Sequence, residues 1–205
     1  MHAGALTVYL VDDDAAVRDS LALMLGLAGY TTAAFADAES LLAAWRADWA
    51  GCVVTDLRLP GMSGLELQAA LRERRSALPV VVITAHGDVP SARVAFRAAA
   101  VDFLEKPFDD AQLRAAIETA FALEERRLEA EQVRAGDSRK LERLTARERE
   151  VLEHAARGLH AKEIGAALGI SPRTVEVHKA RIMEKLGVRN IAELVRFALA
   201  GDKSL

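Results

Sequence analysis

The stretch Val53-Val54-Thr55-Asp56-Leu57 decides how the rest of the chain is arranged. Its first three residues are apolar or β-branched, which is typical of a short strand buried on both faces. Asp56 falls where this strand runs out. In an open parallel sheet that position faces the crevice in which ligands bind. The stretch therefore predicts a carboxylate at the edge of a binding crevice.

Other apolar runs end in polar residues in the same way, namely 8–11 before Asp12 and Asp13, 80–83 before Thr84, and 101–104 before Lys106. Because the carboxyl ends of parallel strands meet at one edge of a sheet, these side chains would surround the same crevice as Asp56. The pattern predicts three acids, a hydroxyl and an ammonium group around one site.

Apolar runs alternate with amphipathic stretches through the first half of the chain. The strand candidates are 6–11, 31–35, 51–56, 79–84 and 101–104. Between them lie helical patterns over 14–28, 37–49, 63–75 and 89–99, and a last one begins near Asp109. Such alternation implies parallel pairing with right-handed crossovers. The sequence thus predicts an α/β doubly wound five-stranded parallel sheet.

The second half of the chain contains helical patterns but no strand pattern. Ala135-Gly136-Asp137-Ser138 breaks the last helical pattern and is interpreted as a linker. From Thr145 onward there is no strand signal, and a capping box opens a helix that Gly158 closes. The next helices are a short one over 160–168, a longer one from Pro172 to Leu186, and one capped by Asn190. A short helix, a Gly-containing turn and a longer helix form a helix-turn-helix pattern.

Composition and charge exclude several classes of protein. The chain is 51% hydrophobic and 28% charged, as ordinary soluble globular proteins are. It has neither an apolar run near the roughly 18 residues that span a bilayer nor an N-terminal secretory pattern. Cys52 is the only cysteine, which excludes an internal disulfide and suits a reducing cytoplasm. Residues 145–205 hold 11 Lys and Arg against 8 Asp and Glu, which favours a polyanionic partner for this part.

The expected acidic cluster has a definite chemistry. Three carboxylates repel one another at pH 7 unless a cation neutralises them or a pKa rises. Asp12, Asp13 and Asp56 offer only oxygen ligands, which suits Mg²⁺. Carboxylates are also covalent nucleophiles toward phosphoryl groups, whose transfer needs positive charge on the equatorial oxygens. These residues favour phosphoryl transfer with Asp56 as nucleophile, Lys106 and Mg²⁺ as the charge clamp, and Thr84 as a hydrogen-bond donor.

The part of the chain through residue 122 resembles the flavodoxin-like receiver domain of a bacterial two-component response regulator. The matching motifs are Val11-Asp12-Asp13, Asp56 followed by Leu59-Pro60-Gly61-Met62-Ser63-Gly64, Thr84-Ala85, and Lys106-Pro107-Phe108. The resemblance implies that Asp56 accepts phosphate from a sensor histidine kinase. It also implies that Phe103 turns inward when Thr84 moves toward the phosphate, and that Mg²⁺ is bound by Asp12, Asp13, Asp56 and the backbone carbonyl of Arg58.

The helix from Pro172 to Leu186 has two distinct faces. Its apolar face consists of Val175, Ile182, Met183 and Leu186. The opposite face consists of Arg173, Glu176, Val177, Ala180, Arg181 and Glu184. A helix of this size fits the major groove, where Arg, Glu and small apolar side chains meet base edges. The long stem of Lys179 crosses the edge between the faces, which places its ammonium within reach of a phosphate.

The stretch from Leu144 to Ala198 resembles the LuxR-type helix-turn-helix of the NarL/FixJ class of response regulators. Leu144 to Leu152, Lys162-Glu163-Ile164, and Ser171 to Gly187 carry this resemblance. It implies that Glu176, Val177 and Ala180 read bases while Arg173 and Lys179 contact the DNA backbone. The full set of expected DNA-binding residues is Lys162, Arg173, Thr174, Glu176, Val177, Lys179, Ala180 and Arg181.

Several of these residues also have a simpler structural interpretation. Asp14 is better explained as the cap of the following helix than as a fourth metal ligand. Phe103 has the alternative of a plain core residue, although its spacing from Lys106 favours the switch. Glu184, Lys185 and Arg189 are expected on a solvated face. His178 is expected to pack against a neighbouring helix.

The sequence as a whole predicts a phosphorylation-dependent DNA-binding transcriptional regulator of a two-component system. Its expected parts are a receiver domain over 1–122, an extended helix and linker over 123–140, and a LuxR-type domain over 141–205. The expected partners are a sensor histidine kinase, double-stranded promoter DNA, RNA polymerase and, after phosphorylation, a second copy of the chain. We expect a cytoplasmic protein without a membrane partner. Its only expected catalysis is its own phosphorylation and dephosphorylation.

Three alternatives fit the sequence less well. A phosphatase with an aspartyl-phosphate intermediate generally needs a second acid near the nucleophile, but the residue two positions beyond Asp56 is Arg58. A constitutive DNA-binding protein with a degenerate receiver conflicts with the intact receiver positions. A scaffold that does not bind DNA conflicts with the complete helix-turn-helix.

Overall fold

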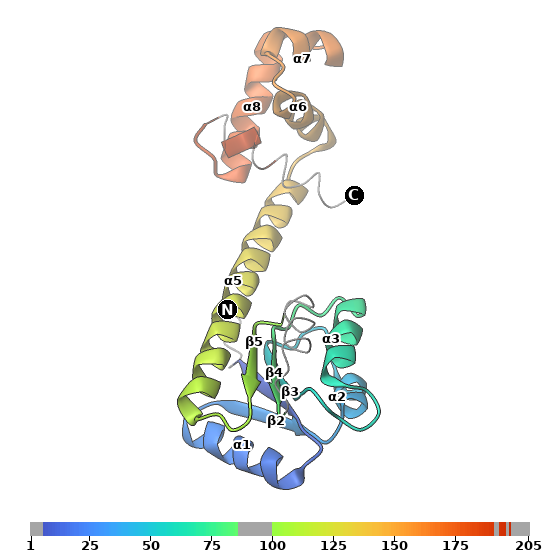
Figure 1. Ribbon diagram of the computed structural model, residues 1–205. Coiled ribbons are helices and arrows are strands. Elements are labelled where there is room, and N and C mark those ends of the chain that lie inside the picture. Colours follow the sequence, from blue (N-terminus) through green and yellow to red (C-terminus); the bar gives the residue numbers. More distant parts are fainter. Residues whose placement is uncertain (1–5, 86–99, 191–192, 196, 198–205) are drawn as a thin grey trace. The chain divides into compact units, whose positions relative to one another are not determined.

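The computed structural model describes residues 6–85, 100–190, 193–195 and 197. Within these residues, five parallel strands form one sheet in the order β2-β1-β3-β4-β5 (Figure 1). Their bounds are Thr7–Val11 for β1, Thr31–Phe35 for β2, Gly51–Asp56 for β3, Val80–Thr84 for β4 and Asp102–Glu105 for β5. The predicted doubly wound sheet is confirmed, and each strand lies within one residue of its predicted bounds.

The two faces of the sheet are covered by different helices. Tyr9, Val53 and Val82 point to a core shared with α2 (Ala38–Ala44) and α3 (Gly64–Glu73). Their neighbours along the strands, such as Val54 and Ile83, point to a second core that includes residues of α1 (Ala15–Leu27) and α5 (Asp110–Glu142). Successive strand residues alternate between the cores because side chains alternate across a strand. The central strand β3 is therefore buried on both sides, and only its end reaches the surface.

Capping residues set where the helices on the sheet begin. The carboxylate of Asp14 accepts hydrogen bonds from the backbone N–H groups of Ala16 and Val17, at 2.8 and 3.3 Å, which confirms its predicted role as the cap of α1. Ser63 and Glu66 form a capping box that opens α3 immediately after the segment that follows Asp56. The helix α3 is thereby fixed close to the end of β3.

The helix α2 is shorter than the predicted stretch 37–49. Residues 45–49, which were expected to continue it, leave the helix and bring two tryptophans against the core. The helix ends at Ala44, where Trp45 turns to an extended backbone. Trp49 stacks on Tyr9 with ring centroids 4.1 Å apart, and both tryptophans pack against the core under α2 and α3. The aromatic contact replaces the helical turn. The predicted helix over 89–99 lies outside the described residues.

The predicted break in the helix at residues 135–138 does not occur, because α5 continues through them to Glu142. A single glycine inside a helix costs only about 1 kcal/mol relative to alanine, which good helix formers on either side offset. Lys140 also forms an i,i+3 ion pair with Asp137, at 3.8 Å. The chain divides into two compact units, residues 1–127 and 128–205.

The second unit contains the predicted helical domain. Its helices are α6 (Ala146–Ala156), α7 (Ala161–Leu168) and α8 (Pro172–Leu186), each within one or two residues of prediction. Their buried apolar residues form one core, which includes Val151, Ile164, Val175, Ile182 and Leu186. The amide oxygen of Asn190 accepts a hydrogen bond from the Glu193 N–H at 2.9 Å, as expected of the cap of a fourth helix. Within the described ranges, no helix is long and apolar enough to cross a membrane.

Candidate functional sites: an acidic crevice and a helix-turn-helix

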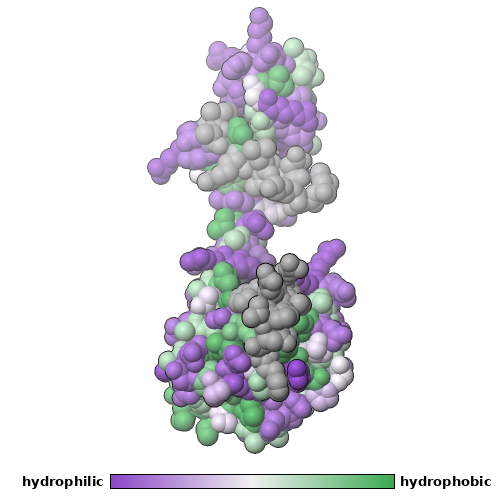
Figure 2. All heavy atoms as spheres, in the orientation of Figure 1, coloured by the Kyte–Doolittle hydropathy of each residue, from purple (hydrophilic) through white to green (hydrophobic). Residues whose placement is uncertain are grey.

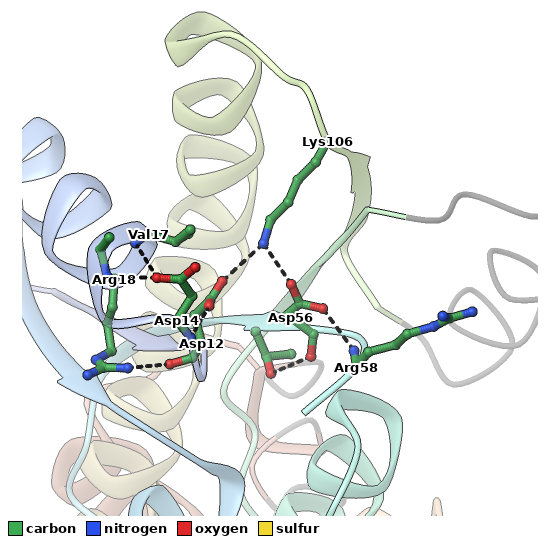
Figure 3. Close-up of polar contacts among 9 residues, drawn as sticks. Asp12, Asp14, Val17, Arg18, Asp56, Arg58 and Lys106 are labelled. Atoms are coloured by element: carbon green, nitrogen blue, oxygen red, sulfur yellow. Dashed lines mark hydrogen bonds and ion pairs between the residues drawn. The ribbon is translucent and has the colours of Figure 1, made fainter. Parts of the chain in front are cut away.

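The ends of three strands bring two acids and a lysine together, as Figure 3 shows. Asp12 follows β1, Asp56 is the last residue of β3, and Lys106 follows β5. The ammonium Nζ of Lys106 lies 2.7 Å from Oδ2 of Asp56 and 3.1 Å from Oδ2 of Asp12. The predicted convergence of these three residues at one edge of the sheet is therefore confirmed.

The ion pairs of Lys106 with the two acids are largely buried. The side chains of Asp12 and Asp56 are 7% and 11% exposed, and that of Lys106 is 24% exposed. Burial by itself lowers the pKa of the Lys106 ammonium, but its hydrogen bonds and ion pairs with Asp56 and Asp12 outweigh burial and raise that pKa above its ordinary value. The lysine is thus held in its charged form between two carboxylates.

Backbone N–H groups orient the remaining carboxylate oxygens. Oδ1 of Asp56 accepts a hydrogen bond from the N–H of Arg58 at 2.8 Å, and Oδ1 of Asp12 accepts one from the N–H of Asp14 at 2.9 Å. Each acid is therefore fixed on one side by the local backbone and on the other by Lys106. A carboxylate held in this way presents a defined oxygen rather than a rotating group.

Arg18 is a residue of this site that the sequence pattern did not indicate. From the end of the first turn of α1, its Nη1 donates a hydrogen bond to the backbone carbonyl of Asp12 at 2.7 Å (Figure 3). The contact ties the helix to the end of β1 where Asp12 begins. Nothing in the spacing singled it out, because an arginine in an amphipathic helix is ordinarily a solvated residue.

Asp13 follows Asp12 after the end of β1, and its predicted role as a metal ligand stays a prediction. This residue is exposed, and among the residues that the structure describes no three acidic, histidine or cysteine side chains form a metal-binding group. Lys106 stands between Asp12 and Asp56 and neutralises only one of their two charges. The donors are all oxygens and the site keeps an excess of negative charge once Asp13 is counted, so the residues present fit a hard cation such as Mg²⁺.

Thr84 and Phe103 lie on the strands that flank this crevice. Thr84 ends β4 and is fully buried, and its backbone carbonyl accepts a hydrogen bond from the N–H of Lys106 at 2.7 Å. Phe103 is partly buried on β5 and packs against the core beneath α2 and α3. The structure thus places Thr84 next to Lys106 in the sheet, and the predicted movement of Phe103 stays a prediction.

The helix α8 presents the two faces that its sequence predicts. Val175, Ile182 and Leu186 are buried, whereas the residues of the opposite face are exposed, namely Arg173, Glu176, Val177, Ala180, Arg181 and Glu184. Val177 is 46% exposed on this face. In the view of Figure 2 the surface of the C-terminal unit is mainly hydrophilic. An apolar side chain on such a surface is available for contact with a partner.

The basic residues expected to meet phosphate lie around this face. Lys162, at the start of α7, is exposed, and Arg173 is exposed in the first turn of α8. The side chain of Lys179 is only 16% exposed and its Nζ lies 3.1 Å from Oε1 of Glu176. Lys179 therefore lies at the edge of the buried face, as predicted, and is paired with a residue of the exposed face.

The structure corrects the expectation that Lys185 lies on a solvated face, because this residue is paired with a buried glutamate. Its Nζ lies 2.6 Å from Oε2 of Glu148, which is 3% exposed in α6. Glu148 also completes the capping box with Thr145 at the start of α6. Burial by itself raises the pKa of Glu148, but the hydrogen bonds from Lys185 and Thr145 outweigh it and lower that pKa below the ordinary value of 4.5.

Replacing Glu148 by glutamine is expected to lower the unfolding free energy of the second unit by about 1 kcal/mol at pH 7. Because the pKa of Glu148 is lowered by folding, its contribution is fully present above pH 4.5 and is lost as the pH falls through the folded value. Urea titrations that follow the methyl NMR signals of Ile164 and Ile182 between pH 3 and 7 measure this. The variant should lose less stability on acidification than the natural protein.

The matched control is Glu150→Gln, which removes an exposed partner of Arg147 from the same helix. We expect this change to have almost no effect, because exposed ion pairs contribute little. Equal pH dependence in the natural protein and in Glu148→Gln would show that the contact with Lys185 does not stabilise the unit.

Comparisons with known proteins match each half of the chain to a protein family. Residues 8–118 match the family model of the response regulator receiver domain, and residues 142–198 match that of the bacterial regulatory proteins of the luxR family. The transcriptional regulatory protein FixJ of Rhizobium meliloti is 46% identical over 199 residues, which cover 95% of this chain and 96% of that protein. FixJ of Bradyrhizobium diazoefficiens is 43% identical over 192 residues, or 94% of each chain.

Solved structures show the same similarity. The structure of the response regulator StyR has a TM-score of 0.82 at 42% sequence identity and covers 95% of this chain and 98% of that one. Full-length FixJ from B. japonicum has a TM-score of 0.59 at 41% identity, with 97% and 98% covered. The sheet, the acidic crevice and the helix-turn-helix thus define a receiver followed by a DNA-binding domain.

The chain belongs to the response regulators that carry a LuxR-type DNA-binding domain. It is accordingly a phosphorylation-dependent DNA-binding transcriptional regulator of a two-component system.

Proposed function

We propose that Asp56 is the phosphoryl acceptor through which a sensor histidine kinase controls this regulator. The observation that carries the proposal is the Lys106 ammonium, 2.7 Å from Oδ2 of Asp56 in a crevice where both side chains are largely buried. A carboxylate oxygen of Asp56 attacks the phosphorus of the phosphohistidine, an O–P bond forms, and the P–N bond breaks with its electrons returning to the imidazole. Lys106 balances the negative charge that gathers on the phosphoryl oxygens.

The residues proposed to hold Mg²⁺ are Asp12, Asp13, Asp56 and the backbone carbonyl of Arg58. Bound there, the ion supplies positive charge to the phosphoryl oxygens in the transition state. The protein's own part is to orient the donors. The backbone N–H of Asp14 binds the carboxylate of Asp12, the guanidinium of Arg18 binds the backbone carbonyl of Asp12, and the backbone N–H of Arg58 binds the carboxylate of Asp56. The catalysis proposed for the receiver is limited to its own phosphorylation and dephosphorylation.

The proposed output is a change of the receiver surface that alters association and DNA binding. The Thr84 hydroxyl hydrogen-bonds the new phosphoryl group, and Phe103 turns inward from β5. Two phosphorylated copies then pair and bind two half-sites on adjacent helical turns of promoter DNA in the cytoplasm, where they engage RNA polymerase. Glu176, Val177 and Ala180 read base edges, while Lys162, Arg173, Thr174, Lys179 and Arg181 hold the DNA backbone.

An intact-mass experiment tests the acceptor. The natural protein and Asp56→Asn are incubated with Mg²⁺ and acetyl phosphate, and borohydride trapping followed by peptide mapping locates the label. We expect one phosphate adduct on the natural protein, on the peptide that contains Asp56, and none on the variant. A label on another residue, or equal labelling of Asp56→Asn, would contradict the proposal.

Arg173→Ala should weaken DNA binding to every sequence by a similar factor and reduce the slope of log affinity against log salt by about 1, because one phosphate contact is lost. Fluorescence anisotropy with labelled duplexes at several salt concentrations measures this. Glu176→Ala should instead change the preferred sequence while leaving the salt slope unchanged.

The charge-matched control is Arg46→Ala, which removes an exposed arginine of the first unit. This variant should keep both the affinity and the salt slope. An unchanged slope in Arg173→Ala would show that Arg173 does not contact a phosphate.

A further inference from the structure

The segment between β3 and α3 carries the groups nearest to Asp56 in the chain. At its start, the N–H of Leu57 donates to the carbonyl of Ile83 at 2.7 Å, and the carbonyl of Leu57 accepts from the N–H of Gly64 at 3.1 Å. Arg58, the next residue, donates its N–H to Oδ1 of Asp56. Both ends of the segment are therefore held at Leu57, and residues 58–62 between them need a second attachment to keep one form.

Glu39 supplies that second attachment from a different helix. It lies in the first turn of α2, and its Oε1 accepts a hydrogen bond from the backbone N–H of Met62 at 3.1 Å. The two residues are 23 positions apart in the sequence. The contact joins the start of α2 directly to the last part of the segment that follows Asp56.

The backbone next to this contact is shaped to admit the carboxylate. Gly61 has φ of +77°, a conformation that residues with a side chain rarely adopt. A Cβ at this position would lie 2.8 Å from Oε1 of Glu39. The absence of a side chain at Gly61 thus allows Glu39 to reach the N–H of Met62.

We propose that Glu39 is a positioning residue for the phosphorylation of Asp56, which rests on the proposed function of Asp56 as acceptor. By holding Met62, it keeps residues 58–61 in the form in which the Arg58 N–H binds Oδ1 of Asp56 and the other carboxylate oxygen faces Lys106. Glu39 is exposed, and α2 packs on the sheet through Ala38, Leu41 and Leu42 instead. Its hydrogen bond therefore serves the segment rather than the core.

The rate of phosphorylation tests this role. Full-length natural protein, Glu39→Ala and Glu39→Gln are incubated with Mg²⁺ and acetyl phosphate, and the adduct on Asp56 is followed by intact mass. We expect Glu39→Ala to react about three- to ten-fold more slowly, as befits the loss of one hydrogen bond. Glu39→Gln should react at nearly the natural rate, because its amide oxygen still accepts from the N–H of Met62.

Two controls separate positioning from stability and charge. Glu73→Ala removes another exposed glutamate of the same unit and should leave the rate unchanged. Circular dichroism gives the folded fraction of each variant, to which the rates are normalised. An unchanged rate in Glu39→Ala, with the natural protein labelled at Asp56, overturns the proposal, and so does a rate in Glu39→Gln as low as in Glu39→Ala. Absence of label on the natural protein overturns the acceptor role itself, and the role of Glu39 with it.

Discussion

Replacing Lys106 by alanine is expected to lower the unfolding free energy of the first unit by about 2 kcal/mol in Mg²⁺-free buffer. The variant leaves Asp12 and Asp56 facing each other at 7% and 11% exposure without the cation that separates them. Removing one partner of a fully buried pair costs about 3–5 kcal/mol, and we expect less here because Lys106 is itself 24% exposed. Saturating Mg²⁺ should remove much of the deficit, because a bound cation neutralises the same carboxylates.

Urea denaturation followed by tryptophan fluorescence measures this effect in one unit alone, because both tryptophans, Trp45 and Trp49, lie in residues 1–127. The control is the double variant Lys106→Ala with Asp56→Asn, which should be more stable than Lys106→Ala because one of the facing charges is gone. If Lys106→Ala were as stable as the natural protein without Mg²⁺, the ion-pair geometry of the crevice would be contradicted.

Gly64→Ala is expected to destabilise the first unit by about 3 kcal/mol. A Cβ at this position would lie 2.4 Å from the backbone oxygen of Asp56 and 3.0 Å from Cγ2 of Thr55. The backbone at the end of β3 is held in the sheet and has no room to yield, so the start of α3 has to move away. That movement shifts the segment after Asp56, so the rate of Asp56 phosphorylation should fall as well.

Gly26→Ala is the matched control, because this glycine lies inside α1 and a Cβ there meets nothing within 4 Å. Alanine is the better helix former by about 1 kcal/mol, so this variant should be as stable as the natural protein or more so. The same fluorescence titration compares the two variants. Equal stabilities would show that α3 does not need its close approach to Asp56.

The sheet and the core of the site were predictable because both follow from local patterns. Apolar runs that end in polar residues locate the strands, and parallel pairing then places Asp12, Asp56 and Lys106 at one edge. The faces of α8 follow in the same way from helical periodicity. Elements with a strong period and an identifiable cap, such as those begun by Asp14 and Ser63, were placed within two residues.

The remaining features depend on contacts that no local pattern contains. Arg18 and Glu39 each form a hydrogen bond with a backbone group. Every residue carries such groups, so the sequence does not indicate which one a side chain will bind. Lys185 is polar and lies near the end of a helix, so the sequence indicates that it is exposed to solvent. Its contact with Glu148 depends on how a different helix, α6, packs against α8. Gly136 signals a break, but its effect is small beside the helix formers around it.

The DNA affinity of the natural protein and of Asp56→Asn, each with and without acetyl phosphate, tests most directly whether Asp56 controls the regulator. The treated natural protein first selects duplexes from a random-sequence pool, and anisotropy at fixed salt then measures all four affinities for the selected duplex. We expect phosphorylation to raise the affinity of the natural protein at least about five-fold, which corresponds to the lower end of the usual coupling of about 1–3 kcal/mol, and to leave Asp56→Asn unchanged. Equal affinity in all four samples, or the same increase in Asp56→Asn, would contradict control through Asp56.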